Sequence, residues 1–219
     1  MYNKSNEFIE DICESIKEQA NNYINEKGSF TLVLSGGRTP KDIFLELSDN
    51  YKGSIDWTKV HLFWLDERCV SPTHEDSNYK LAHDYLISKL DSIGSVHRMK
   101  GELDPVVAAK EYENDIVTFF ERDDIVFDFI LLGMGEDGHV ASLFPNSKEV
   151  KLKDKLVIST EEKYNGHYRI SLGLNLVNKS KFKLLMVTNA EKKEILDSES
   201  LNLPIHKIEN IKLKVYKND

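Results

Sequence analysis

The chain has 219 residues, 40% hydrophobic and 30% charged, an ordinary balance for a globular protein. Its net charge of −8 argues against nucleic acid or an anionic membrane as the main partner, although a small anion needs only a local cluster of cations and N–H groups. No apolar run is long enough to span a membrane, and the N-terminus lacks the apolar core of a signal peptide. We therefore expect one cytoplasmic α/β domain over residues 1–219.

The first elements predict a strand, a glycine turn and a helix. Apolar residues from Phe8 to Ile24 recur at helical spacing, and the run from Phe30 to Leu34 is typical of a buried strand. The turn Ser35-Gly36-Gly37-Arg38-Thr39-Pro40 follows at once. Thr39 is a good N-cap and Pro40 suits the first helical position, so a helix should begin there.

This turn has the features of a phosphate site. Gly36 and Gly37 let the backbone approach a ligand closely, and a helix N-terminus offers free N–H groups to an anion. Arg38 adds a planar donor fork that suits phosphate. The alternative interpretation is an ordinary tight turn with a solvated arginine.

The next strand should run from Val60 to Leu65, with the charged triplet Asp66-Glu67-Arg68 at its carboxyl end. Within it, His61 is expected to be a hydrogen-bonded structural residue. Ser77 is expected to cap the helix that follows, and Asp104-Pro105 is a cap-plus-first-residue pair for another. The two cysteines, Cys13 and Cys69, are expected to be small buried hydrophobes, with a reactive thiol at Cys69 as the alternative. No Cys/His cluster of zinc type is present in the sequence, so no metal is expected.

A buried strand from Phe127 to Leu132 should lead into the glycine-rich stretch from Gly133 to Pro145, with a helical or turn segment beginning near His139. Open α/β sheets bind their ligands at such strand ends, and histidine changes charge near neutral pH. The spacing of Gly133, Gly135 and Gly138 also matches the dinucleotide fingerprint. We disfavour that interpretation, because two carboxylates would lie beside a pyrophosphate and several elements precede the motif.

The last third predicts three further strands, at Leu156 to Ser159, Tyr168 to Leu172 and Lys183 to Thr188, and a final one at Ile211 to Tyr216. Arg169 within the second run is either exposed at an edge or held by an anion. The stretch from Asn189 to Lys193 begins the helix after the third run, and Lys192 within it either reaches the carboxyl edge of the sheet or is a solvated helix lysine.

Strands alternate with helices throughout, which predicts a mostly parallel sheet covered on both faces. The carboxyl ends of its strands should then bring the polar turns together at one edge. This convergence predicts an active site.

Several of these stretches resemble one known family, the 6-phosphogluconolactonases of the glucosamine-6-phosphate isomerase/6-phosphogluconolactonase family. The resemblance rests on five motifs that occur in the family's order and cover most of the chain: Leu34 to Pro40, Asp66 to Arg68, Asp76 to Tyr79, Gly133 to Pro145 and Thr188 to Lys192. It departs from the family pattern at Val140, Asn146 and Asn189, which replace a common threonine and two common glycines. These changes spare the charged groups.

The resemblance implies a Rossmann-like three-layer sandwich of the kind shared with glucosamine-6-phosphate deaminase and ribose-5-phosphate isomerase. It implies hydrolysis of 6-phosphoglucono-δ-lactone to 6-phosphogluconate in the oxidative pentose phosphate pathway, with no metal or organic cofactor. It leaves a monomer and a homodimer equally open.

The resemblance also assigns roles to residues. His139 matches the general base, and Asp137 is its expected orienting partner. The glycines Gly133, Gly135 and Gly138 are oxyanion candidates. The residues expected to bind the substrate or its phosphate are Gly36, Gly37, Arg38, Thr39, Asp66, Arg68, Arg169 and Lys192.

Two other functions stay open at this point. An amino-sugar-phosphate deaminase or isomerase on the same fold would share the phosphate turn, but the sequence Asp137-Gly138-His139 resembles the lactonase version of the motif. A non-catalytic sugar-phosphate sensor would bind the ligand without turnover. It is disfavoured because His139 and Asp137 are both present and no basic DNA-binding helix is evident.

Overall fold

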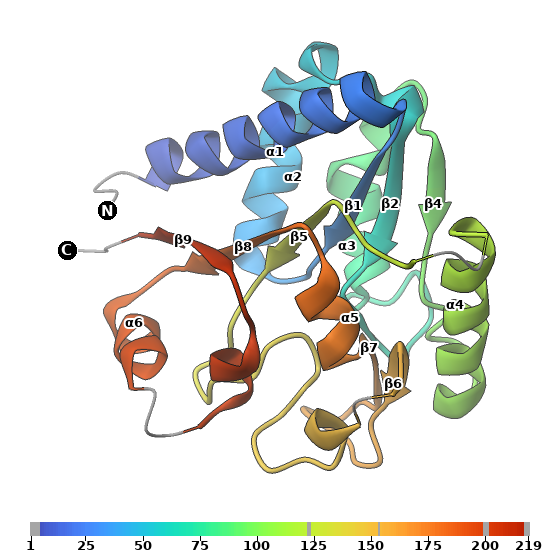
Figure 1. The fold of residues 1–219 in the computed structure, drawn as a ribbon, viewed down its shortest axis with the longest axis vertical. Coiled ribbons are helices and arrows are strands. Elements are labelled where there is room, and N and C mark those ends of the chain that lie inside the picture. The colour runs from blue at the N-terminus through green and yellow to red at the C-terminus, as the bar shows by residue number, and fades with distance from the viewer. Residues whose placement is uncertain (1–4, 122–123, 153, 199–201, 217–219) are drawn as a thin grey trace.

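The structure is a computed structural model that describes residues 5–121, 124–152, 154–198 and 202–216 (Figure 1). Its main sheet has six parallel strands in the order β4-β2-β1-β5-β8-β9. In chain order these are β1 (Phe30–Leu34), β2 (Val60–Trp64), β4 (Ser95–His97), β5 (Phe129–Leu132), β8 (Phe182–Val187) and β9 (Ile211–Val215). The predicted mostly parallel α/β sheet is confirmed.

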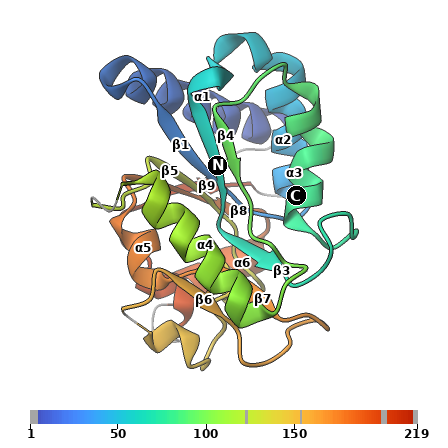
Figure 2. The ribbon, with the colours of Figure 1, turned by 90° about the vertical axis from the view of Figure 1, so that its right-hand side faces the viewer.

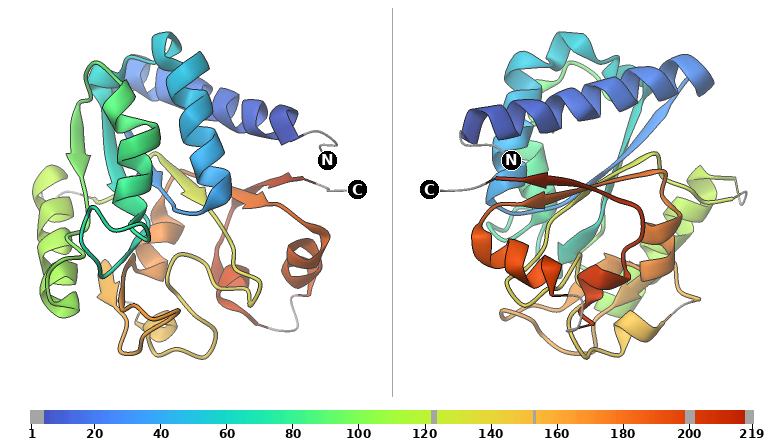
Figure 3. Two further views of the ribbon diagram at one scale, coloured as in Figure 1. Left: turned by 180° about the vertical axis from the view of Figure 1, so that it is seen from behind. Right: turned by 60° about the vertical axis from the view of Figure 1, so that its left-hand side comes forward.

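Helices cover both faces of this sheet. Figure 2 shows α2 and α3 on one side of the parallel strands and α4 and α5 on the other, and α1 packs along α2 (Figure 3). The helices are α1 (Ser5–Lys27), α2 (Arg38–Asn50), α3 (Asn78–Tyr85), α4 (Pro105–Phe119), α5 (Leu174–Lys179) and α6 (Ala190–Asp197). The arrangement is therefore a three-layer sandwich.

Local chemistry explains why several of these elements begin where they do. Strands β1 and β5 consist almost wholly of apolar side chains and are buried along their whole length, as expected of strands covered on both faces. The side chains of Ser77, Asp104 and Asn189 accept hydrogen bonds from the first turns of α3, α4 and α6. The caps predicted at Ser77 and Asp104 are confirmed.

A second, smaller sheet was not predicted. The strands β3 (Asp66–Arg68), β7 (Arg169–Leu172) and β6 (Val157–Ser159) pair antiparallel in the order β3-β7-β6. The charged triplet after β2 is thus a short strand in its own right. Its three polar residues carry no apolar alternation, so periodicity gives no signal for it.

The start of α2 differs from the prediction. The helix begins at Arg38, and its N-cap is Gly37, whose φ of 110° only glycine adopts readily. Thr39 and Pro40 are therefore the second and third helical residues, and no side chain caps this end. Because of the conformation of Gly37, the helix begins two residues before Pro40, the start expected for a Thr39 cap.

Candidate active site

A pocket of about 190 Å³ lies at the carboxyl edge of the parallel sheet. It is lined by the segments that follow β1, β2, β5 and β8, which confirms that these strand ends converge. Most of the predicted site residues line it: Gly36, Gly37, Arg38, Thr39, Asp66, Arg68, Gly133, Gly135, His139 and Lys192. Asp137, Gly138 and Arg169 lie outside this lining.

One wall of the pocket is suited to an anion. The N-terminus of α2 opens onto it at Gly37, and Arg38 and Lys192 supply two positive charges. Burial lowers the pKa of Lys192, Glu136 acts in the opposite direction, and the nearby Arg38 adds to the lowering. A desolvated ammonium next to a second cation is a favourable partner for a dianion.

The position of Lys192 is fixed by the first turn of α6. Asn189 is the N-cap of this helix and accepts a hydrogen bond from the backbone N–H of Lys192 at 2.8 Å. The asparagine that departs from the family pattern therefore holds the first turn that carries the lysine. Asn146, which also replaces a common glycine, has a φ of 63°, a conformation that asparagine tolerates better than most residues.

The triplet in β3 divides between the pocket and the core. Asp66 and Arg68 line the pocket, whereas Glu67 points to the other side of the strand and is 2% exposed. The carboxylate of Glu67 accepts hydrogen bonds from Ser77 Oγ and from the backbone N–H groups of Arg68, Asn78 and Tyr79, at 2.7–3.0 Å. Glu67 thus fixes the start of α3 against β3.

Asn78 at the start of α3 is a pocket residue that was not predicted as a site residue. Its side-chain amide donates to the backbone oxygen of Asp66 at 2.9 Å and to its carboxylate at 3.2 Å. A Cβ atom placed on Gly36 would lie 1.8 Å from Asn78 Oδ1. Gly36 is therefore required by its contact with Asn78.

Ser142 also contacts Asp66 and was likewise not predicted as a site residue. Its hydroxyl donates to the other carboxylate oxygen of Asp66 at 2.7 Å. Both oxygens of Asp66 are thus engaged, which holds the carboxylate in one orientation. Ser142 lies three residues after His139 in the stretch from Gly133 to Pro145. Its hydrogen bond to Asp66 could not be predicted without knowing that β3 lies beside this loop.

His139 and Asp137 form the predicted pair. His139 Nδ1 lies 2.6 Å from Asp137 Oδ1, and the same carboxylate oxygen accepts the backbone N–H of His139 at 3.1 Å. The imidazole ring contacts Phe144, with 4.7 Å between ring centres. A Cβ atom at Gly135 would lie 2.2 Å from the ring, so only glycine leaves room for the histidine in this position.

The glycine loop decides between the two alternatives near His139. A turn and not a helix begins there, because residues 133–148 form turns and isolated bridges, and a dinucleotide site would need a helix at this point. The N–H of Gly135 donates to His139 O, and the N–H of Gly138 donates to Gly135 O. These two amides stabilise the loop and are not available to an oxyanion in this conformation. Gly133 lines the pocket and stays a candidate.

Arg169 is neither at an edge nor in the pocket lining. It lies on the middle strand β7, is 5% exposed, and is paired in register with Arg68 of β3. Nη2 donates to Tyr164 O at 2.8 Å, whereas Nε and Nη1 are buried without a hydrogen-bond partner among the described residues. Burial and the charge of Arg68 lower the pKa of its guanidinium.

The described residues contain no cluster of three or more His, Cys, Asp or Glu side chains that could hold a metal ion. Within the same ranges, no helix combines the length and apolarity that crossing a bilayer demands.

The fold and the pocket define an α/β protein with a positively charged pocket wall and a histidine–aspartate pair at the carboxyl edge of a parallel sheet. The family model for glucosamine-6-phosphate isomerases/6-phosphogluconolactonase matches residues 3–215. The chain belongs to this family.

Several proteins named 6-phosphogluconolactonase are similar to this chain. A 6-phosphogluconolactonase from Synechocystis sp. is 36% identical over 79% of this chain and 72% of its own length. A 6-phosphogluconolactonase from Treponema pallidum is 35% identical over 80% of this chain and 76% of its own. The crystal structure of the Thermotoga maritima 6-phosphogluconolactonase superposes with a TM-score of 0.85 at 28% identity, covering 99% of this chain and 97% of that one.

Proposed function

We propose that this chain is a 6-phosphogluconolactonase that hydrolyses 6-phosphoglucono-δ-lactone to 6-phosphogluconate in the oxidative pentose phosphate pathway. The observation that carries the proposal is the His139–Asp137 pair, with the imidazole facing a pocket whose other walls hold Arg38, Arg68 and Lys192. Family membership and the names of the relatives support the substrate class.

His139 is the proposed general base. An ionised carboxylate only accepts hydrogen bonds, so Asp137 fixes the proton of the imidazole on Nδ1 and leaves Nε2 as the basic nitrogen. Nε2 removes a proton from water as the water oxygen attacks C1 of the lactone. When the bond between C1 and the ring oxygen breaks, the same nitrogen returns the proton to that oxygen.

The phosphate of the substrate is proposed to bind at the α2 N-terminus. Gly36, Gly37 and Thr39 line this end of the pocket, and Arg38 and Lys192 supply the charges. Asp66, which Asn78 and Ser142 hold in place, is oriented to accept a hydrogen bond from a sugar hydroxyl. Gly133 is the remaining candidate among the three glycines for a backbone donor to the oxyanion.

Arg68 and Arg169 have different proposed roles. Arg68 lines the pocket and is anchored by a hydrogen bond from Nη1 to Asp76 O at 2.7 Å. Arg169 is buried directly opposite, and we assign to it a contribution to the positive potential beside Arg68 rather than substrate contact in this conformation.

The test is the disappearance of freshly generated 6-phosphogluconolactone at near-neutral pH, because the lactone also opens without enzyme. Wild type, His139→Ala and buffer alone are compared. General acid–base catalysis predicts that kcat falls by ~10²–10⁴ in His139→Ala while substrate still binds. Asp137→Asn tests the orienting role and should lower kcat with little change in KM.

Two outcomes would contradict the proposal. A wild-type rate equal to that of buffer would exclude the lactonase activity, and unchanged turnover in His139→Ala would exclude the base. Glucosamine 6-phosphate serves as the comparison substrate. Release of ammonia from it would indicate the deaminase reaction instead, and binding without turnover of either compound would indicate a sensor.

A further inference from the structure

A second polar cluster lies at the edge of the main sheet. Ser95 Oγ is 2.6 Å from His97 Nε2, and His97 Nδ1 is 2.9 Å from Asp115 Oδ2. On its other side, Ser95 Oγ is 2.8 Å from His61 Nδ1. The order of atoms along Ser95, His97 and Asp115 is that of a serine–histidine–aspartate triad. The cluster is called the edge relay below.

Hydrogen-bonding chemistry fixes the direction of every bond in the edge relay when both imidazoles are neutral. Asp115 only accepts, so His97 carries its proton on Nδ1 and its Nε2 must accept from the Ser95 hydroxyl. The single proton of Ser95 is then used, so His61 Nδ1 donates to Ser95 Oγ. The serine proton therefore points at a base that an aspartate orients.

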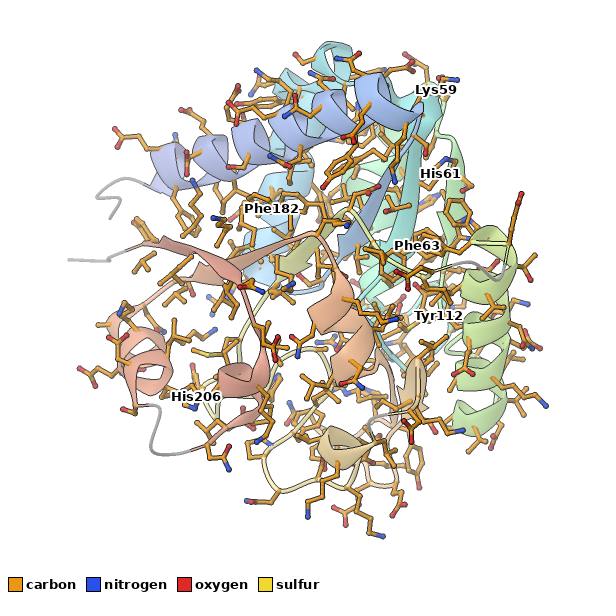
Figure 4. All side chains as sticks on the ribbon, in the orientation of Figure 1. Lys59, His61, Phe63, Tyr112, Phe182 and His206 are labelled. Atoms are coloured by element: carbon orange, nitrogen blue, oxygen red, sulfur yellow. The ribbon has the colours of Figure 1, made fainter. Side chains whose placement is uncertain are left out.

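Packing holds the two imidazoles in place. The ring of His97 stacks on Phe63 with 4.4 Å between centres and an angle of 3°, and it also meets Phe119 of α4 at 5.0 Å. The ring of His61 contacts the same Phe119 at 4.9 Å. Figure 4 labels His61 and Phe63 on β2, beside the edge strand β4. Burial lowers the pKa of His61, with further lowering by His97 and Lys27 and opposition from Asp128, which favours its neutral form.

The edge relay is separate from the pocket. Ser95 pairs in register with His61, the second residue of β2, whereas the pocket begins at Leu65 beyond the end of that strand. At roughly 3.3 Å per residue, four residues of strand separate them by ~13 Å. Solvent reaches the relay, because the side chains of His97 and Asp115 are 15% and 43% exposed.

We propose that Ser95 is an activated nucleophile and that the edge relay is a modification site, which takes an acyl group from a small activated ester. The Ser95 oxygen forms a bond to the ester carbonyl carbon, and the bond from that carbon to the leaving oxygen breaks. The hydroxyl proton moves to His97 Nε2, where Asp115 stabilises the imidazolium, and the leaving group departs as its anion.

The probe is p-nitrophenyl acetate, which releases p-nitrophenolate on acyl transfer. Wild-type protein is expected to gain one acetyl group that peptide mapping locates at Ser95. Ser95→Ala should lose this modification. His97→Gln and Asp115→Asn should acquire it at least about tenfold more slowly, on the usual scale for a positioned base. Asp115→Asn is the informative variant, because its half-exposed side chain can be changed without disturbing the core.

Controls separate this inference from the proposed lactonase activity. His139→Ala should be acetylated at Ser95 at the wild-type rate, and Ser95→Ala and Asp115→Asn should hydrolyse the lactone as wild type does. Ser92→Ala, an exposed serine in the same segment, should leave the labelling unchanged. Peptides from wild type that carry no acetyl group at Ser95, or Asp115→Asn protein labelled at the wild-type rate, would overturn the proposal.

Discussion

At the scale of single residues, the pocket joins charged groups that the sequence places far apart. Lys192 is the sharpest case, because its half-buried ammonium lies beside Arg38 at the proposed phosphate end. Lysine binds phosphate as a compact point charge with rotatable donors. Its contribution is therefore measurable as substrate affinity.

We expect Lys192→Ala to raise KM by roughly tenfold or more, because one charged hydrogen bond is worth about 1.5–3 kcal/mol. kcat should change less. The matched control is Lys193→Ala, whose lysine forms an ion pair with Asp197 on the same helix and does not line the pocket. Steady-state kinetics measure both KM values. An unchanged KM for Lys192→Ala would show that Lys192 does not bind the phosphate.

The same lysine should give the activity an alkaline limit. Its pKa is lowered by burial, so the ammonium loses its proton at a lower pH than an ordinary lysine does. As pH rises through that value, the positive charge disappears and KM should increase. Lys192→Arg stays charged, so its KM should remain flatter over the same pH range. An identical rise in both proteins would assign the effect to another group.

Sequence reasoning identified the charged residues of the pocket but not the polar residues that hold them. Asn78 and Ser142 both bind the carboxylate of Asp66, from segments 12 and 76 residues away. Neither has a distinctive residue type, and their function appears only when β3, α3 and the glycine loop meet. Sequence also does not show that the loop uses the N–H groups of Gly135 and Gly138 internally, which leaves Gly133 as the remaining oxyanion candidate.

At the scale of elements, a buried tyrosine of α4 hydrogen-bonds to the end of β2. The hydroxyl of Tyr112 accepts the backbone N–H of Trp64 at 2.8 Å and donates to its carbonyl oxygen at 3.0 Å. Both backbone groups belong to the last residue of β2, where the parallel ladder ends. Figure 4 labels Tyr112 on α4.

We expect Tyr112→Phe to destabilise the protein by about 1–3 kcal/mol, because it leaves a buried N–H and a buried carbonyl without their partner. For a chain of this size that corresponds to a fall in Tm of roughly 2–4 °C per kcal/mol. Tyr168→Phe is the control, since that ring is 37% exposed, and its Tm should stay the same. Equal melting temperatures for wild type and Tyr112→Phe would show that water replaces the hydroxyl.

The elements themselves were largely predictable because β1, β5 and β8 are mostly apolar runs and the capping residues are distinctive. The smaller sheet was not, because β3 consists of Asp66, Glu67 and Arg68. Such a strand forms through pairing with β7 and through the four hydrogen bonds to Glu67. The pairing with β7 is long-range, since Asp66 pairs with Ser171, and it leaves no local pattern in the sequence.

At the scale of the whole molecule, the two cysteines report on different parts. Cys13 is buried between α1 and α2, where its thiol lies 3.8 Å from Ile43 O. Cys69 follows β3, beside the smaller sheet. Burial raises the pKa of both thiols, that of Cys69 to about 11. The alternative of a reactive thiol at Cys69 is therefore disfavoured, since the thiolate is the nucleophile.

Thiol labelling should therefore be slow in the native protein at neutral pH and should follow opening of the structure. We expect Cys69 to label at least about tenfold faster than Cys13, because a small sheet at the periphery opens locally more readily than the core does. The labelling rate of Cys13 should rise with denaturant concentration with the full slope of global unfolding. Cys69→Ser removes the faster phase. Equal rates and equal slopes for both thiols would mean that the two sheets open as one unit.

The contact between Gly36 and Asn78 links two stretches of the chain that evolution would have to change together. A methyl group at position 36 has no room while asparagine occupies position 78, since its carbon would lie 1.8 Å from Asn78 Oδ1. Loss of Asn78 alone would remove one of the two side chains that hold Asp66 and still leave the turn intact. The two positions should therefore show epistasis. An alanine at 36, harmful by itself, becomes sterically acceptable only in a background where residue 78 has already become smaller.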